Sequence, residues 1–143
     1  MQESVEYMEQ LDYVVNNLKS NNLKVTSQRI SIYSYLINSK EHPTAEKVYT
    51  DLKPKNPNLS LGTVYKTLET LKSNQLILGF NVGESSSRYD GNIEPHVHFM
   101  CSECDNVFDI QANVQLDSKD LDGFEVTSLQ GFIYGKCKHC SNN

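Results

Sequence analysis

The amino-acid sequence lacks any apolar run close to the ~20 residues that a membrane-spanning helix needs. It also lacks basic residues at its start: MQESVEYMEQ contains acids and no lysine or arginine, which argues against a signal or transit peptide. An excess of positive charge is missing too, since 13 lysines and arginines oppose 18 aspartates and glutamates, a net charge of −5. The 143-residue chain as a whole is therefore not a basic coat for nucleic acid. We expect a soluble, cytoplasmic protein of one domain or two small ones.

The charge is divided unevenly along the chain. Residues 13–80 contain nine basic and four acidic residues, a net charge of +5, whereas residues 81–143 contain four basic and ten acidic residues, a net charge of −6. This division favours two functional halves, of which the first is a candidate for binding nucleic acid or another anion. An ordinary solvated surface can show the same imbalance, so the charge alone does not decide.

Four helical patterns fill the first half. Apolar residues recur at steps of three and four over residues 4–19, and similar stripes follow after caps at Thr26 or Ser27, at Thr44 and at Ser60. His42-Pro43 predicts an extended residue and a break. Two short β-like runs, residues 76–82 and 87–90, flank Gly83-Glu84-Ser85 and indicate a hairpin. Helices followed by a hairpin are typical of a winged helix-turn-helix.

The pattern changes after Gly91. Residues 97–100 and 107–110 predict strands around a turn that contains cysteine. A weakly patterned helix is predicted over residues 113–121, and a second strand pair over residues 125–129 and 132–135, joined at Gln130-Gly131. We place the domain boundary near residues 85–94.

All four cysteines fall in this second half, as Cys101-x-x-Cys104 and Cys137-x-x-Cys140. Each pair follows a predicted strand, and two such turns facing each other offer four thiolates in the tetrahedral arrangement that suits Zn²⁺. A piece of roughly 50–60 residues is marginally stable alone, and a structural zinc ion compensates for its small core. The alternatives are two disulfides, which usually require a secreted protein, or a redox-active pair, which usually occurs once and near a βαβ unit.

His96 and His98 lie at alternate positions of a predicted strand, so their imidazoles point to the same face. Asp90 precedes them, and Asp109 ends the next strand, which we expect to pair with theirs. Mixed imidazole and carboxylate ligands suit Fe²⁺ or Mn²⁺. From spacing alone, a polar loop with surface histidines is an equally good interpretation, and sequence distance does not connect His42 with this cluster.

In their order along nearly the whole chain, the motifs resemble the ferric uptake regulator (Fur) family: TSQR at 26–29, HPTA at 42–45, LSLGTVY at 59–65, SSRYD at 86–90, HxHxxCxxC at 96–104 and CxxC at 137–140. Within the family, the short His96-x-His98 motif and the aspartates at positions 90 and 109 are most similar to those of peroxide-sensing repressors. Lys66 and Gly62 differ from the residues usual at those positions in the family. The resemblance therefore does not predict which operator sequence this chain binds.

The resemblance implies an α+β fold: an N-terminal winged helix-turn-helix DNA-binding domain (residues 1–85), a hinge (86–94) and a small α/β dimerisation domain with a structural zinc site (95–143). It implies a homodimeric, metal-dependent repressor that binds a double-stranded DNA operator. The implied ligands are Cys101, Cys104, Cys137 and Cys140 for structural Zn²⁺, and His42, Asp90, His96, His98 and Asp109 for regulatory Fe²⁺ or Mn²⁺. Hydrogen peroxide is then sensed when bound iron catalyses oxidation of His42 or His96 to 2-oxo-histidine.

For DNA contact we expect Tyr65 and Lys66, with Ser60 and Thr63 reaching phosphates or bases near the start of the fourth helix. The alternative for Tyr65 is a core position against the wing. For the whole protein, the alternatives are an iron- or manganese-responsive regulator of metal homeostasis, a metal enzyme and a zinc-stabilised interaction module. Beside a winged helix the chain leaves no room for a substrate pocket, which argues against an enzyme, and we expect peroxide to be the only small-molecule substrate.

Overall fold

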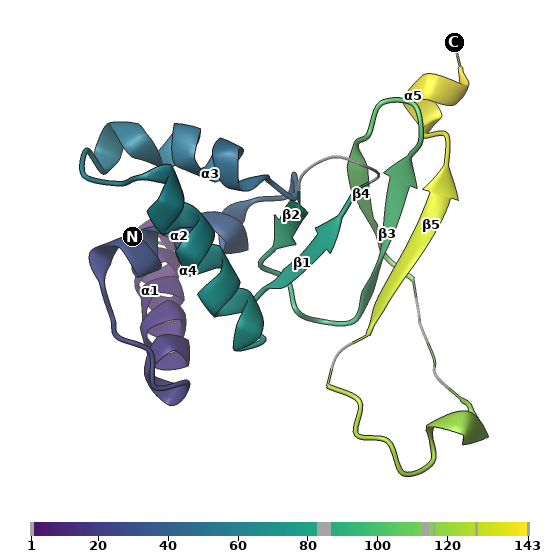
Figure 1. The fold of residues 1–143 in the computed structure, drawn as a ribbon, viewed down its shortest axis with the longest axis horizontal. Coiled ribbons are helices and arrows are strands. Elements are labelled where there is room, and N and C mark those ends of the chain that lie inside the picture. Colours follow the sequence, from purple (N-terminus) through teal and green to yellow (C-terminus); the bar gives the residue numbers. More distant parts are fainter. Residues whose placement is uncertain (1, 83–86, 113–114, 116, 128, 143) are drawn as a thin grey trace. The chain divides into compact units, whose positions relative to one another are not determined.

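The computed structural model describes residues 2–82, 87–112, 115, 117–127 and 129–142. It is an α+β structure that divides into two compact units, Met1–Asn92 and Ile93–Asn143 (Figure 1). The first unit holds the long helices and a two-stranded hairpin, and the second holds a three-stranded sheet. Among the described residues, no helix combines the length and the apolar character needed to cross a membrane.

The first unit is a winged helix-turn-helix. Its helices and strands are α1 (Gln2–Ser20), α2 (Ser27–Asn38), α3 (Ala45–Leu52), the short 3₁₀ helix η1 (Lys53–Lys55), α4 (Leu61–Ser73), β1 (Leu78–Asn81) and β2 (Ser87–Asp90). The two strands pair antiparallel, with Leu78 opposite Asp90. The predicted hairpin turn at Gly83-Glu84-Ser85 lies outside the described residues.

Three helices begin where the sequence predicts them to begin. The side chains of Thr26, Thr44 and Ser60 accept hydrogen bonds from the backbone N–H three residues ahead, at 3.2, 3.2 and 3.1 Å. Each cap satisfies an amide that has no partner within its own helix, which stabilises the helix by about 1 kcal/mol. These caps confirm the predicted helix starts.

The helices pack around one core to which every long element contributes. The fully buried side chains come from α1, α2, α3, α4 and the hairpin region, and they include Val14, Leu18, Ile32, Tyr33, Leu36, Val48, Val64, Leu68, Leu71, Ile77 and Tyr89. The predicted apolar stripe of α1 is buried only in its second half, since Val5 and Met8 remain more than half exposed. The core therefore holds α4 between the other helices and the hairpin.

The loop between α2 and α3 corrects one prediction. The chain does break at His42-Pro43, but His42 is not extended, because its φ angle is +52°. Histidine is one of the few residues other than glycine that enter this left-handed region with some frequency. The conformation is held from β2: the Arg88 guanidinium donates to the His42 carbonyl at 3.0 Å, and the Tyr89 N–H donates to the Pro43 carbonyl at 3.0 Å.

The second unit is built on a mixed sheet with the order β4-β3-β5. Its elements are β3 (His96–Cys101), β4 (Val107–Ile110), the short 3₁₀ helix η2 (Lys119–Leu121), β5 (Gln130–Gly135) and α5 (Lys138–Ser141). β3 pairs antiparallel with β4 and parallel with β5, with His96 opposite Gln130 and Cys101 opposite Gly135. The parallel pairing requires a long crossover between β4 and β5 in place of a tight turn.

Two predictions for this unit are wrong. Of the helix predicted over residues 113–121, positions 113, 114 and 116 lie outside the described residues, and the rest shows only η2. Residues 125–127 and 129 form no strand, and Gln130-Gly131, predicted as a turn, begins β5. The glycine at position 131 is explained by packing and not by a turn, since a Cβ there would lie 3.2 Å from Cγ2 of Val97 on the neighbouring strand.

Removing a core side chain of α4 tests this packing. Leu68 is fully buried, so Leu68→Ala should lower the free energy of unfolding by about 2–5 kcal/mol. Lys66→Ala, on the exposed side of the same helix, should change it by no more than about 0.5 kcal/mol. Urea unfolding of the zinc-loaded protein measures both, and equal effects of the two substitutions would contradict the described core.

Candidate metal sites and nucleic-acid interface

The parallel pairing of β3 with β5 brings the two Cys-x-x-Cys motifs together. Cys101 ends β3 opposite Gly135, and Cys137 follows two residues later at the start of α5. The backbone joins the two motifs directly, because the Ser102 N–H donates to the Gly135 carbonyl at 2.8 Å and the Cys137 N–H donates to Sγ of Cys101 at 3.3 Å. The Sγ atoms of the four cysteines all lie within 4.8 Å of one another.

The four thiols are arranged for a metal ion and not for disulfides. All four cysteines are free, and Sγ of Cys104 lies 3.8 Å from Sγ of Cys137, far beyond the ~2.05 Å of a disulfide. The N–H of Cys137 lowers the pKa of Cys101 to about 6, whereas the hydrogen bond with the Cys137 thiol raises the pKa of Cys140 to about 12. Four crowded sulfurs cannot all ionise without a cation among them. The set fits structural Zn²⁺, which four thiolates bind tetrahedrally.

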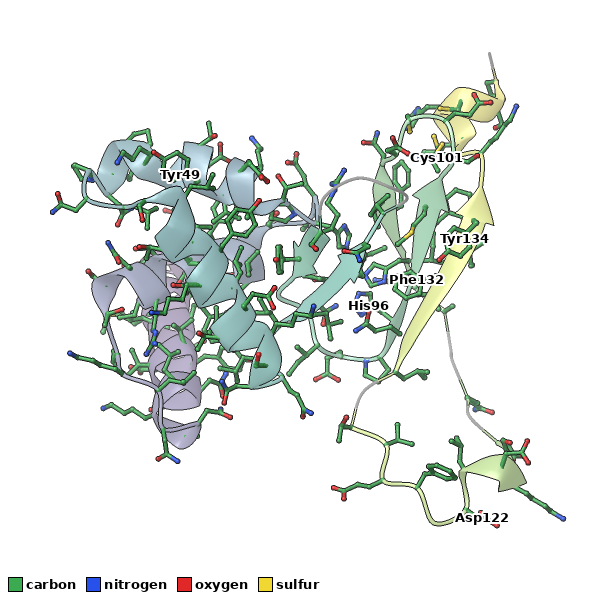
Figure 2. All side chains as sticks on the ribbon, in the orientation of Figure 1. Tyr49, His96, Cys101, Asp122, Phe132 and Tyr134 are labelled. Carbon is green, nitrogen blue, oxygen red and sulfur yellow. The ribbon has the colours of Figure 1, made fainter. Side chains whose placement is uncertain are left out.

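A second group of ligand atoms lies on one face of the same sheet, at the end of β3 where Figure 2 labels His96. Nε2 of His96 lies 2.9 Å from Nε2 of His98, and Oδ1 of Asp109 lies 3.5 and 3.6 Å from these two nitrogens. Asp109 is the direct strand partner of His98, so the register of β3 and β4 creates the group. The structure thus brings these three predicted side chains together within this unit, and their role as metal ligands remains a prediction.

Neighbouring residues orient both imidazoles. Nδ1 of His96 lies 2.6 Å from the carbonyl oxygen of Glu94, which fixes the proton on Nδ1 and leaves the lone pair of Nε2 directed at His98 and Asp109. The ring of His98 stacks on Phe132 of β5, with a centroid distance of 5.4 Å. Sequence reasoning missed Glu94 and Phe132, since a backbone carbonyl and a distant aromatic carry no motif.

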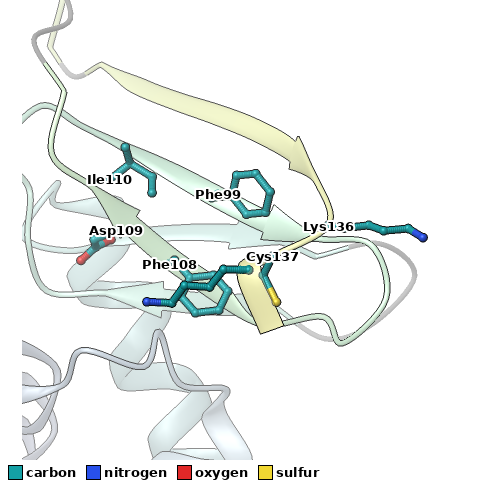
Figure 3. A pocket seen from close by; sticks show the side chains of 7 residues that line it. Phe99, Phe108, Asp109, Ile110, Lys136 and Cys137 are labelled. Atoms are coloured by element: carbon teal, nitrogen blue, oxygen red, sulfur yellow. The ribbon is translucent and has the colours of Figure 1, made fainter. Parts of the chain in front are cut away.

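The opposite face of this sheet is apolar. Phe99, Phe108 and Ile110 line a pocket there, bordered by the zinc-site turn at Lys136–Lys138 (Figure 3). Since successive strand residues alternate in direction, the ligand face and the apolar face share the same two strands. The side chains of His96, His98 and Asp109 thus lie together on the face opposite Phe99.

The remaining two candidate ligands lie together in the first unit. Nε2 of His42 lies 3.3 Å from Oδ2 of Asp90, and both residues are buried, with 2% and 5% of their surface exposed. His42 follows α2, and Asp90 ends β2. A buried imidazole and carboxylate are both suitable ligands for Fe²⁺ or Mn²⁺. The five predicted ligands thus form two subsets, one in each unit, and their grouping around one ion remains a prediction.

The predicted DNA-contacting residues occupy the first turns of α4. Ser60 caps the helix and its hydroxyl lies 2.9 Å from that of Thr63, while Tyr65 and Lys66 are exposed. Tyr65 is not a core residue, so that alternative is wrong: 38% of it is exposed and its hydroxyl donates to Glu46 of α3. This hydrogen bond lowers the pKa of Glu46 and raises the pKa of Tyr65. The sequence offers no signal for Glu46, which lies 19 positions away.

Loss of one thiolate tests the zinc assignment. Cys101→Ser should abolish zinc retention and unfold the second unit, because bound Zn²⁺ supplies folding free energy directly. Ser102→Ala removes an exposed hydroxyl beside the same turn and should keep one zinc ion per chain. Native mass spectrometry gives the zinc content and circular dichroism the folding. Full zinc content in the Cys101→Ser protein would contradict the assignment.

Comparison with known proteins agrees with this geometry. The model of the ferric uptake regulator family matches residues 20–130. The peroxide-responsive repressor PerR of Staphylococcus aureus (strain Mu50 / ATCC 700699) is 34% identical over 144 aligned residues, which cover 98% of this chain and 96% of that protein. PerR of Staphylococcus aureus strain NCTC 8325 / PS 47 shows the same identity and coverage.

Two solved structures have the same fold. The ferric uptake regulator of Helicobacter pylori superposes with a TM-score of 0.70 at 22% identity, covering 95% of this chain and 94% of that one. PerR of Streptococcus pyogenes superposes with a TM-score of 0.54 at 30% identity, covering 91% and 92%. This chain is a metal-responsive transcriptional regulator and belongs to the ferric uptake regulator family.

Proposed function

We propose that the chain is a cytoplasmic, homodimeric repressor that binds operator DNA when both metal sites are filled and releases it when hydrogen peroxide oxidises a ligand histidine. The observation that carries this proposal is the pair of ligand subsets, His42 with Asp90 in one unit and His96 with His98 and Asp109 in the other. In this proposal residues 1–85 bind DNA, residues 86–94 act as a hinge and residues 95–143 form the dimer.

The short tether between the subsets supports a shared metal ion. Asp90 and His96 are six positions apart in the sequence, so the intervening chain cannot span more than about 20 Å. Fe²⁺ or Mn²⁺ held by all five ligands then fixes one angle between the units. In a dimer this angle sets the separation of the two α4 helices, and successive major grooves on one side of DNA are about 34–36 Å apart. By linkage, DNA should in turn tighten metal binding.

Peroxide sensing needs one further property of the same site. His42, Asp90, His96, His98 and Asp109 would hold the ion, and Fe²⁺ there would supply reducing chemistry toward peroxide that Mn²⁺ would not supply readily. In the overall reaction one peroxide oxygen is added to the imidazole of His42 or His96, and the other leaves as water. In the product, 2-oxo-histidine, both ring nitrogens carry hydrogen beside a carbonyl, so neither offers the lone pair that would bind the ion. The thiolates, held by zinc, are not the primary sensor.

The DNA interface is assigned to the exposed start of α4. Tyr65 and Lys66 face solvent, and Ser60 and Thr63 lie at the helix N-terminus, where amides and the helix dipole favour a phosphate. The positive balance of residues 13–80 favours the approach of DNA to this half of the chain.

The dimer is assigned to the second unit. β5 lies at the edge of the described sheet and pairs with β3 on one side only. Ile133 and Tyr134, which point to opposite faces of this edge strand, are 46% and 72% exposed. Such edges are templates for pairing with another chain.

Mass spectrometry tests the sensing reaction. After brief exposure to hydrogen peroxide, the iron-loaded protein should carry one added oxygen on the peptide with His42 or His96, and the manganese-loaded protein should carry none. Peptides with the four cysteines provide the internal control. If neither metal form gains oxygen, the protein is a regulator of iron or manganese homeostasis that shares these ligands, and the peroxide proposal is wrong.

A ligand substitution tests metal-dependent DNA binding. His42→Ala removes one ligand and should weaken binding of Mn²⁺ by more than the roughly 10- to 100-fold that loss of an outer hydrogen-bond partner costs. The gain in DNA affinity on adding Mn²⁺ should disappear with it. Fluorescence anisotropy with a duplex selected from random DNA by the manganese-loaded protein measures this gain. His139→Ala, an exposed histidine outside both ligand subsets, should behave as the unsubstituted protein.

A further inference from the structure

The carboxylate of Asp90 is held by two different groups, one for each oxygen. Oδ1 accepts a hydrogen bond from the backbone N–H of Asn92 at 2.9 Å, and Oδ2 lies 3.3 Å from Nε2 of His42. The first contact closes a turn over Gly91, in which an aspartate side chain bonds to the backbone two residues ahead. The turn therefore directs Oδ2 at His42.

Gly91 lies against the backbone of the last turns of α2. A Cβ on Gly91 would be 2.7 Å from the carbonyl carbon of Leu36, 2.8 Å from its oxygen and 2.8 Å from the nitrogen of Ile37. These distances are too short for any real contact, and helix backbone cannot move aside as a flexible side chain can. A glycine is needed here for close approach.

The same end of α2 leads directly to His42. The helix ends at Asn38, and the N–H of Ser39 still donates to the carbonyl of Leu36 at 3.2 Å. Three residues later the chain reaches His42, whose carbonyl is bonded from β2 by Arg88. Gly91 is next to Asp90, and Leu36 is at the end of the helix that leads to His42. Contact between Gly91 and Leu36 therefore fixes the separation of His42 and Asp90.

We propose that Gly91 is a positioning residue that sets the affinity of the regulatory metal site. By lacking a side chain, it lets the Asp90–Asn92 turn rest on the end of α2 and keeps the carboxylate of Asp90 beside His42. Any larger residue displaces the turn, separates the two ligands and weakens binding of the divalent ion. This inference rests on the proposed function, in which His42 and Asp90 share that ion.

Calorimetric titration of the full-length, zinc-loaded protein with Mn²⁺ tests the proposal. Gly91→Ala should weaken Mn²⁺ binding by about 10- to 100-fold, as expected for the loss of a group that orients a ligand. Gly62→Ala is the matched control, since a Cβ there meets nothing nearer than Oγ of Ser60 at 4.0 Å, and it should bind Mn²⁺ within about twofold of the unsubstituted protein. Zinc content should be the same in all variants.

A double substitution separates positioning from general destabilisation. If Gly91 acts through Asp90, then Asp90→Asn with Gly91→Ala should bind Mn²⁺ no more than about twofold more weakly than Asp90→Asn alone. The proposal would be overturned if the fold-loss of Mn²⁺ affinity in the double variant equalled the product of the losses in the two single variants. If Gly91→Ala unfolds the first unit, Asn92→Pro decides, because it removes the N–H that holds Asp90 and leaves Gly91 in place. Unchanged Mn²⁺ affinity in that variant would also overturn it.

The controls distinguish this inference from the proposed function. If the unsubstituted protein binds no ion besides zinc, the proposed function fails. If it binds Mn²⁺ and Asp90→Asn weakens binding, but Gly91→Ala binds as the unsubstituted protein does, then only the role of Gly91 is wrong.

Discussion

The second unit depends on the parallel pairing of β3 with β5. This pairing places Gly135 beside Cys101 and so delivers Cys137 and Cys140 to the first cysteine pair. It also places Phe132 beneath the ring of His98. Because parallel strands need a long crossover, the contact joins residues about 30 positions apart and has a high cost in loop entropy. A zinc ion bound across the two motifs offsets that cost at the point where the strands end.

The first unit is organised by its helical core and by the contacts of β2. Capped helices form a buried core, and β2 then contacts the loop between α2 and α3 at three successive residues, Arg88, Tyr89 and Asp90. The imidazole of His42 is thereby held beside a carboxylate. Most of the candidate histidine and aspartate ligands lie on strands, whereas His42 lies in a loop that contacts with β2 hold in place.

The sequence predicts those features that depend on short-range chemistry. Helix caps at Thr26, Thr44 and Ser60, the alternation that puts His96 and His98 on one face, and the two cysteine pairs all follow from spacing. Predictions failed where strand pairing outweighed a local signal: the sequence predicts a turn at Gly131, but this residue pairs with Val97 in β5, where a Cβ would lie 3.2 Å from Cγ2 of Val97. Motifs specific to a family connected His42 with the other ligands, which no periodicity could do.

Residues that only position the ligands left no signal in the sequence. The carbonyl of Glu94, the ring of Phe132 and the missing side chain of Gly91 act through contacts that are set by the fold. Their chemistry is ordinary, and their role depends on where the strands and helices place them.

The left-handed backbone of His42 gives this ligand an energetic role besides coordination. A residue other than glycine in that region costs of order 1–3 kcal/mol, and the residue that follows here is a proline, which restricts the backbone further. The contacts of His42 with β2 offset this cost, and in the proposed function an ion bound to its imidazole offsets it further. If oxidation of the ring ends ion binding, as in the proposed function, the backbone strain opposes the previous conformation and favours movement of the loop between α2 and α3. In this proposal, the addition of one oxygen atom to the imidazole of His42 leads to a displacement of the backbone between α2 and α3.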